Sequence, residues 1–427
     1  MKKLHIGVIG LGTVGAGVVK ALRARRHLIR ERSGVDLQLV QACDARRGQG
    51  TRVGLSGSMF TTRARDILEN PKIDVVVELI GGMHPAKDII LQAFSRRKHV
   101  VTANKALLAQ CMPELLSAAR RKGRQLKFEA SVCGGIPLIK ALREGLIANR
   151  IDSLYGIING TSNYVLSKMA QASLSFPEAL TLARKKGYAE RNARFDIEGI
   201  DAAHKLVVLS YLLFAKHVAF DNVVREGISG IKEMDVRYAR DMGCVIKPLA
   251  IVKKSDKDLE VRVHPTLLPE DHMLAAVNGV FNAALLRGDL VGDMLFYGRG
   301  AGSLPTSSAV VSDLVDLAHG EESGQALLAA KPSARRVRKT DEIRSRYYLR
   351  FMAIDKPGVF AKISGVLGRY QIGIAQVHQK ERKWAKFVPV VMITHEAQER
   401  NLRRALERID RLAIVKGKTV KIRMEDF

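Results

Sequence analysis

The chain has 427 residues, a length that predicts two or three domains of roughly 100–200 residues each. It contains 70 lysine and arginine residues against 43 acidic residues, so its formal net charge is +27 and a nucleic-acid partner has to be considered. The basic residues are spread along the chain and aromatic residues make up only 5% of it, so nucleic acid is not expected as the main partner. No apolar run reaches the roughly 18–20 residues that a membrane span requires.

The cysteines give an expectation about the compartment. Their spacing matches neither a metal site nor a redox pair, which favours free thiols in a cytoplasmic protein. They are Cys43, Cys111, Cys133 and Cys244.

The N-terminal segment has the pattern of a dinucleotide-binding fold. Residues 4–10 form an apolar run typical of a buried parallel strand, a GxGxxG sequence follows, and residues 18–22 have the apolar spacing of a helix. In this context the glycines allow a tight turn, a close approach of the pyrophosphate and close packing of helix on strand, and the helix N-terminus faces the phosphates. The residues predicted to contact NAD or NADP here are Gly10, Gly12, Thr13, Val14 and Gly15.

The end of the second predicted strand leaves the choice of cofactor open. Residues 37–43 read as a strand, and Asp44 follows them at the position where a carboxylate accepts from the ribose 2′-hydroxyl of NAD. Arg46 and Arg47 come next and could instead hold the 2′-phosphate of NADP. An insertion over residues 25–34 lengthens the usual spacing of ~20 residues, so both cofactors stay open, with a slight preference for NADP or dual use.

Further alternation of strands and helices completes the first predicted domain at residue 130. Residues 73–80 and 99–105 read as strands, and in open α/β sheets ligands gather at the carboxyl ends of such strands. Thr102, Asn104 and Lys105 are therefore placed for contact with the cofactor or the substrate, and Thr102 and Lys105 are predicted to contact the cofactor.

Residues 187–205 concentrate charged side chains before a long apolar helix. Asp201 and Lys205 are four positions apart and share one face of that helix. Taken alone, the plainer interpretation is a capped surface helix with an ordinary ion pair.

Six stretches of the chain resemble homoserine dehydrogenases. They are VVELIGGMHPAKDIILQAF, HVVTANKALLA, FEASVCGGIPLIKAL, IINGTSNYVLSKM, GYAERNARFDIEGIDAAHKL and YGRGAGSLPTSSAVVSDL. The resemblance implies an oxidoreductase that reversibly reduces L-aspartate 4-semialdehyde to L-homoserine with NADPH or NADH, in threonine and methionine biosynthesis. It also implies a homodimer or homotetramer.

The resemblance implies an α/β fold with three parts. A Rossmann nucleotide-binding domain is expected over residues 1–130, with a helix near 305–320 packing back on it, and an α+β substrate and dimerisation domain over residues 131–330. A polar, basic linker over residues 331–346, which contains Pro332, is followed by a C-terminal domain over 347–427. The predicted order there is β-α-β-β-α-β, which is ferredoxin-like, and DKPGVFAKIS resembles an ACT domain. Threonine is the regulator that the resemblance implies for such a domain, although a purely structural role is also open.

The resemblance assigns Lys205 as the proton donor to the aldehyde oxygen. Hydride delivery to a carbonyl builds alkoxide character, which an ammonium group can stabilise and protonate. The residues implied in substrate binding are Glu190, Asp201, Asp196, Thr161 and Tyr164, and those implied in further cofactor contacts are Gly187, Glu190 and Gly302.

Residues 129–136 are similar to the monovalent-cation loop of the family. The side chain of Glu129 and the carbonyl groups of Val132, Gly134 and Ile136 would supply oxygen ligands to an ion such as Na⁺. Without the resemblance, this loop reads as a glycine-bearing turn.

One segment departs from the family pattern. The family usually has Asp-Pro two and three residues after the position of Glu190, whereas this chain has Asn192 and Ala193, followed by Arg194 and Phe195. The change puts the fine geometry of the substrate loop in question. It also supports an alternative, a non-catalytic regulatory protein of the same fold that senses nucleotide and amino acid without turnover.

Overall fold

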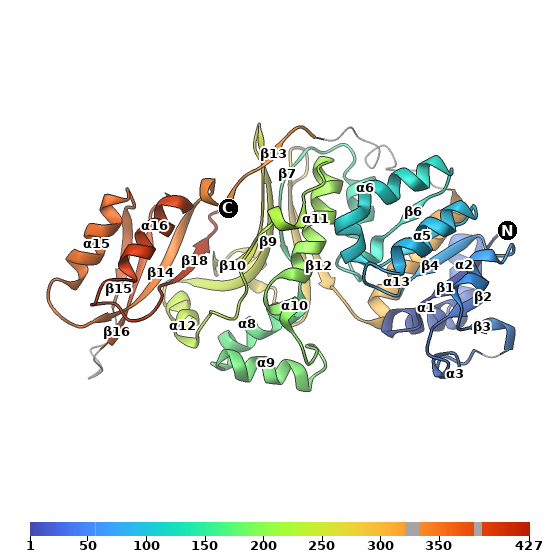
Figure 1. The fold of residues 1–427 in the computed structure, drawn as a ribbon, viewed down its shortest axis with the longest axis horizontal. Coiled ribbons are helices and arrows are strands. Elements are labelled where there is room, and N and C mark those ends of the chain that lie inside the picture. The colour runs from blue at the N-terminus through green and yellow to red at the C-terminus, as the bar shows by residue number, and fades with distance from the viewer. Residues whose placement is uncertain (56, 321–332, 380–386) are drawn as a thin grey trace. The chain divides into compact units, whose positions relative to one another are not determined.

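The computed structural model, drawn in Figure 1, describes residues 1–55, 57–320, 333–379 and 387–427. The chain forms two compact units. The first unit comprises Met1–Leu154, Asp201–Asp221 and Phe281–Ala334. The second comprises Tyr155–Ile200, Asn222–Val280 and Arg335–Phe427. Pro332 of the predicted linker lies outside the described residues. In the part of the chain that the structure describes, no helix has the length and apolarity of a membrane span.

The first unit is built on a six-stranded parallel sheet with the strand order β3-β2-β1-β4-β5-β6. Its strands are apolar runs because they are covered on both faces, and Ile6 and Val8 of β1 are fully buried. This is the strand order of a Rossmann domain, as predicted. The strands are β1 (Lys2–Ile9), β2 (Val35–Cys43), β3 (Phe60–Thr61), β4 (Val75–Glu78), β5 (His99–Thr102) and β6 (Leu126–Lys127).

Helices cover this sheet. α1 and α13 pack on each other and on the sheet, and Ala309, Val310 and Leu314 of α13 share a core with Val18 and Val19 of α1. The insertion at residues 25–34 forms a helix of its own, α2, which ends at Gly34 in the left-handed conformation, with φ +67°. The α-helices of this unit are α1 (Thr13–Ala24), α2 (Arg26–Ser33), α3 (Gly48–Arg52), α4 (Ala64–Glu69), α5 (Ala86–Ser95), α6 (Lys105–Arg121), α7 (Leu138–Lys140), α11 (Ile200–Phe214) and α13 (Ser303–His319). The first residue of α11, Ile200, is assigned to the second unit. The unit also holds the antiparallel hairpin of β11 (Phe281–Gly288) and β12 (Gly292–Arg299), and β7 (Ile151–Ile157) begins in it.

The second unit combines the remainder of the predicted substrate domain with the C-terminal domain in one sheet. β9 and β10 form a long antiparallel hairpin, and β18 pairs with both β10 and β14. Its elements before the C-terminal domain are α8 (Gly160–Ala172), α9 (Phe176–Lys185), α10 (Arg194–Ile197), β8 (Val224–Arg225), α12 (Glu233–Asp241), β9 (Cys244–Lys254), β10 (Asp258–Pro269) and β13 (Arg336–Val337).

The C-terminal domain has the predicted β-α-β-β-α-β order, with one short extra strand. β14 begins at Arg344, inside the segment expected as a linker, because its first residues pair with the short strand β17. The elements are β14 (Arg344–Ile354), α15 (Val359–Arg369), β15 (Ile374–His378), β16 (Phe387–Thr394), β17 (Ala397–Gln398), α16 (Glu399–Ile409) and β18 (Val420–Met424).

A buried ion pair connects α12 with β14 inside this unit. The guanidinium of Arg350 donates to both carboxylate oxygens of Asp235, at 2.5 and 3.1 Å, and the hydroxyl of Tyr348 donates to one of them at 2.9 Å. Asp235 is 0% exposed and Arg350 is 2% exposed, so neither charge has water as an alternative partner.

Candidate active site

The glycine loop between β1 and α1 has a separate physical reason for each glycine. Gly10 has φ +101°, and a side chain on it would meet the carbonyl of Leu79 at 2.7 Å. A Cβ on Gly15 would lie 1.8 Å from the carbonyl oxygen of Gly10. Nothing lies within 4 Å of a Cβ on Gly12, so this glycine leaves room for a ligand rather than for the protein. α1 begins at Thr13, and the unpaired N–H groups of its first turn form an anion-binding end.

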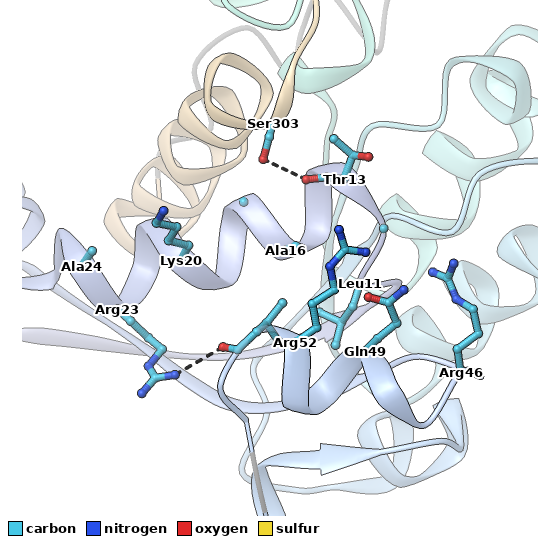
Figure 2. Close-up of a pocket in the computed structure, with 13 residues that line it drawn as sticks. Leu11, Thr13, Ala16, Lys20, Arg23, Ala24, Arg46, Gln49, Arg52 and Ser303 are labelled. Carbon is cyan, nitrogen blue, oxygen red and sulfur yellow. Dashed lines mark hydrogen bonds between the residues drawn. The ribbon is translucent and has the colours of Figure 1, made fainter. Parts of the chain in front are cut away.

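A cavity of about 940 Å³ opens at this helix N-terminus, and Gly12, Thr13 and Arg46 are among the residues that line it. Thr13 and Arg46 are labelled in Figure 2. Ser303, the first residue of α13, donates its hydroxyl to the carbonyl of Thr13 at 2.9 Å. A glycine that leaves open space, a helix N-terminus and a cationic lining together fit the phosphates of a nicotinamide dinucleotide. The cationic residues of the lining are Lys20, Arg23, Arg46 and Arg52.

Of these cations, sequence analysis singled out only Arg46. Lys20 and Arg23 come from the exposed side of α1, and Arg52 comes from the short helix α3 after β2. For Arg52, the available signal in the sequence was the number of basic residues after the second strand. Which of those residues face the glycine loop depends on the position of α3.

Asp44 is buried at the end of β2, and both of its carboxylate oxygens are engaged. One oxygen accepts the backbone N–H of Leu11 at 2.9 Å, and the other accepts the backbone N–H and the Nε–H of Arg46, each at 3.0 Å. The hydrogen bond with the Arg46 side chain lowers the pKa of Asp44 to about 2, so the group is ionised at neutral pH. Asp44 therefore ties the glycine loop to β2, and its contact with a ribose stays a prediction.

Thr102 joins the carboxyl ends of β4 and β5. It is fully buried, donates its hydroxyl to Glu78 at 2.7 Å, and accepts the backbone N–H of Asn104 at 3.0 Å. Asn104 in turn caps α6 by accepting the N–H of Leu107. This capped end is what positions Lys105 as the first residue of α6.

Lys105 and Lys205 hold one carboxylate between them. Nζ of Lys205 lies 2.7 Å from Oδ2 of Asp201, and Nζ of Lys105 lies 2.8 Å from Oδ1. Asp201 and Lys205 are 6% and 7% exposed, whereas the side chain of Lys105 is 42% exposed. Burial opposes the ionisation of Asp201, but the charges of Lys205 and Lys105 outweigh it and hold the pKa of this carboxyl well below its usual range.

The i,i+4 pair was predicted from the sequence, and the participation of Lys105 was not. α11 is apolar on nearly all sides and is buried along almost its whole length, so the pair lies in the interior rather than on a solvated surface. Two ammonium groups on one buried carboxylate form a fixed electrostatic site that could stabilise a developing alkoxide.

The loop predicted to hold a cation begins at Glu129. Its two carboxylate oxygens accept the backbone N–H groups of Ile139 and Lys140 at 3.0 and 2.7 Å, and the carbonyl of Ile136 accepts the N–H of Leu138 at 2.8 Å. Burial raises the pKa of Glu129 to about 7 in spite of these bonds. A nearby cation would favour the ionised form of this carboxyl.

The carbonyl groups of Val132 and Gly134 belong to the same loop. Gly134 packs closely against Thr306, and a Cβ on it would lie 2.7 Å from that hydroxyl. Among the described residues, no group of three or more His, Cys, Asp or Glu side chains could hold a metal ion. The cation site stays a prediction.

The predicted substrate residues of the second unit gather at the N-terminus of α8. Asn159 caps this helix by accepting the N–H of Ser162 at 2.8 Å, and it donates to Asp196 at 2.8 Å. The hydroxyl of Thr161 donates to the carbonyl of Tyr188 at 2.6 Å. The loop that follows α9 is thereby fixed to α8 at two points.

Tyr164 lies on the first turns of α8 and is 4% exposed. Its ring meets that of Tyr188 edge to face at 5.0 Å. Its hydroxyl is buried and has no hydrogen-bond partner among the described residues, which is a costly state that a ligand would relieve.

Gly187 and Glu190 occupy the loop after α9. Gly187 has φ +71° and donates its N–H to the carbonyl of Arg184, as the glycine that ends a helix. Glu190 is exposed. The unusual segment leads into the short helix α10. Ala193, directly before the helix, is buried, and Phe195 within it is 59% exposed. These residues belong to the second unit, whereas Lys105, Asp201, Lys205 and Gly302 belong to the first.

Comparison with known proteins covers the whole chain. Residues 10–129 match the model of the homoserine dehydrogenase NAD-binding domain, residues 137–315 match that of homoserine dehydrogenase, and residues 347–413 match that of the ACT domain. A homoserine dehydrogenase of Pseudomonas aeruginosa is 43% identical, with 100% of each chain covered. The chain belongs to the homoserine dehydrogenase family. A second relative, the homoserine dehydrogenase of Helicobacter pylori, is 40% identical with 100% of each chain covered.

Solved structures agree with this family. A homoserine dehydrogenase from Thiobacillus denitrificans has a TM-score of 0.93 at 43% identity, covering 100% of this chain and 99% of that chain. A homoserine dehydrogenase of S. aureus at pH 7.5 has a TM-score of 0.77 at 31% identity, covering 100% of both chains. The predicted family, oxidoreductase class and three-part fold are thus confirmed, and the alternative of a non-catalytic regulatory protein receives no support.

Proposed function

We propose that Lys205 is the proton donor when the chain carries out the reaction of a homoserine dehydrogenase, the reversible reduction of L-aspartate 4-semialdehyde to L-homoserine. The observation that supports it is the buried cluster in which Asp201 holds the ammonium groups of Lys205 and Lys105 at 2.7 and 2.8 Å. When bound, the nicotinamide cofactor supplies the hydride. Lys205 stabilises the alkoxide character that develops on the aldehyde oxygen and gives it a proton, while Asp201 holds the ammonium group in position.

The amino-acid end of the substrate is bound by residues of the loop after α9 and of α8. Glu190 is exposed and acidic, which suits it to pair with the α-ammonium of the substrate. Tyr164 has a buried hydroxyl without a partner among the described residues, which suits it to donate to the substrate carboxylate. Asp196 and Thr161 hold the loop in place through Asn159 and Tyr188. Gly187 and Gly302 allow the backbone to approach the cofactor.

NADP is the preferred cofactor in this proposal, with NAD also accepted. Arg46 is exposed and lines the cavity at the helix N-terminus, and Arg52 and Lys20 add to its positive charge. Nε and Nη2 of Arg46 donate to Asp44 at 3.0 and 3.1 Å, so Nη1 is the group that would donate to the 2′-phosphate. The carboxylate of Asp44 is already occupied by Leu11 and Arg46, which weakens the case for a ribose contact specific to NAD.

Three further properties belong to this proposal. Glu129, with the carbonyl groups of Val132, Gly134 and Ile136, holds a monovalent cation such as Na⁺. The ACT domain binds threonine, and the chain forms a homodimer or homotetramer. The protein acts in the cytoplasm, which is consistent with its four free cysteines.

A steady-state assay of L-homoserine oxidation with NAD⁺ and with NADP⁺ tests activity and cofactor together. Arg46→Ala should raise the KM for NADP⁺ about tenfold or more, as expected for the loss of a charge-assisted hydrogen bond of ~1.5–3 kcal/mol, and should leave the KM for NAD⁺ nearly unchanged. The matched control is Arg47→Ala, because Arg47 is exposed next to Arg46 and is not among the residues that line the cavity. Absence of turnover with either cofactor would disprove the proposed reaction. Equal losses in both arginine variants would disprove the role of Arg46.

A further inference from the structure

The second unit contains a separate cavity of about 310 Å³ that none of the predicted site residues lines. Its walls come from the C-terminal half of α8, from α12, from the start of β9, and from the residues after β10. A volume of about 300 Å³ is the lower end of the range for small-molecule sites. The cavity is therefore large enough for a molecule the size of a small amino acid.

A buried ammonium group lies in the wall of this cavity. Lys247 of β9 is 4% exposed, and its Nζ donates to the carbonyl of Val277 at 2.6 Å and to Oδ1 of Asn278 at 3.0 Å. Both acceptors are neutral, and together they use two of the three ammonium hydrogens. Burial lowers the pKa of Lys247 to about 8, and no acidic group among the described residues offsets this effect.

A buried charge with neutral partners alone is unusual in a folded protein. Lysine is almost never fully buried unless it is paired, because removal of the ammonium from water is expensive. Elsewhere in the same unit buried cations do have acidic partners, as Arg350 has Asp235 and Arg262 has Glu260. Lys98 of the first unit is buried to the same extent and donates only to the carbonyl groups of Asn70 and Ile73. What distinguishes Lys247 is that it lines a cavity, in which an anion can meet the third ammonium hydrogen.

The other polar groups of the cavity define the chemistry of that anion. The hydroxyl of Ser167 is buried, accepts the backbone N–H of Gly279 at 3.1 Å and donates to Oδ1 of Asn278 over a long distance of 3.4 Å, a bond that a carboxylate can replace. Apolar residues such as Leu166 and Ala275 form much of the remaining buried wall. Arg240 and Glu270 are exposed lining residues of opposite charge. A buried cation and hydroxyl suit a carboxylate, the apolar wall suits a short aliphatic group, and the exposed Glu270 suits an ammonium.

We propose that this cavity is a binding site for a small α-amino acid, with its carboxylate on Lys247 and Ser167 and its ammonium toward Glu270. The site is distinct from the nucleotide cavity, which belongs to the first unit, and it does not involve the ACT helices. Nothing in the proposal depends on the assignment of Lys205.

Titration calorimetry on the full chain tests the site with two probes, L-alanine and propionate. L-Alanine should bind with a dissociation constant in the millimolar range or better, about −4 kcal/mol, and more tightly than propionate because propionate has no ammonium. Lys247→Met should weaken the binding of both probes at least tenfold. The control is Lys257→Met, which removes the same charge from an exposed position in the β9–β10 turn and should leave both affinities unchanged.

Two further variants keep the test decisive if Lys247→Met does not fold. Gln171→Trp changes an exposed lining residue on α8, should fold normally, and should block both probes. Glu270→Gln should abolish the preference for L-alanine over propionate. The proposal is overturned if neither probe saturates at about 10 mM, or if binding survives unchanged in the Lys247 and Gln171 variants.

Discussion

The shared carboxylate of Asp201 makes the two lysines a matched pair for testing the proton donor. Lys205→Met and Lys105→Met each remove one ammonium at nearly the same distance, 2.7 or 2.8 Å, and each leaves Asp201 with its other cationic partner. Removing one partner from an isolated buried pair costs about 3–5 kcal/mol, so a smaller loss of folding stability is expected here. Both variants should therefore be folded at 25 °C, with thermal midpoints lowered by several degrees at most.

Catalysis should separate the two variants. The kcat of Lys205→Met should fall by about 10²–10⁴ in both directions of the reaction, the range for loss of a positioned general acid, while cofactor affinity changes little. Lys105→Met retains the donor and should lose less, because its side chain is 42% exposed and part of its charge is screened by water. Initial rates of homoserine oxidation and semialdehyde reduction, together with calorimetric midpoints, give the comparison. If Lys205→Met stays within tenfold of wild type while Lys105→Met loses 10² or more, Lys105 is the donor and the present assignment is wrong.

Three other predictions follow from the structure. Gly12→Ala should leave the thermal midpoint unchanged, because the added Cβ meets nothing in the protein, but it should weaken nucleotide binding about tenfold or more in a fluorescence titration, because the Cβ takes space left for the ligand. Gly15→Ala should lower the thermal midpoint, because its Cβ would lie 1.8 Å from a carbonyl oxygen. Asp235→Ala removes the partner of the buried Arg350 and should destabilise the second unit by about 3–5 kcal/mol. Arg344→Met removes an exposed ion pair and should cost about 0–1 kcal/mol. Equal shifts of the thermal midpoint in the two variants would contradict this expectation. Burial disfavours ionisation of Glu226, yet the charges of Arg423 and Lys421 lower its pKa from the ordinary value of 4.5 to about 2. The contribution of the ionised Glu226 to the free energy of unfolding is therefore complete above pH 4.5 and is lost as the pH falls toward 2. Glu226→Gln should therefore flatten the dependence of the thermal midpoint on pH in that window, and an unchanged slope would count against the ion pairs.

Much of the fold could be read from the sequence because its signals are local. Apolar runs predicted the central strands, and the order of strands and helices predicted both the Rossmann domain and the C-terminal domain. β3 was missed because two residues, Phe60 and Thr61, carry no periodicity of their own and are strand only by pairing with β2. The insertion at residues 25–34 was recognised by its length, but its polar, arginine-rich sequence gave no strong signal for α2.

Part of the candidate site was also accessible from the sequence. The glycine loop and the Asp201–Lys205 pair depend on spacings of a few residues, so their geometry follows once the strand and the helix form. The cationic lining contributed by Lys20, Arg23 and Arg52 was not predicted, because a chain with 70 basic residues offers too many candidates.

The sequence by itself determined the family, the nucleotide fold and the i,i+4 pair on α11, because each rests on a local pattern of glycines, apolar residues or charges. Only the tertiary structure decided that Lys105 shares Asp201 with Lys205, that Asp44 ties the glycine loop to β2, and that Lys247 is buried with neutral partners. Ionic interactions act over a few ångströms in space, whatever the separation along the chain. Which charges meet, and which are left in an apolar wall, is therefore fixed by the packing of helices and strands.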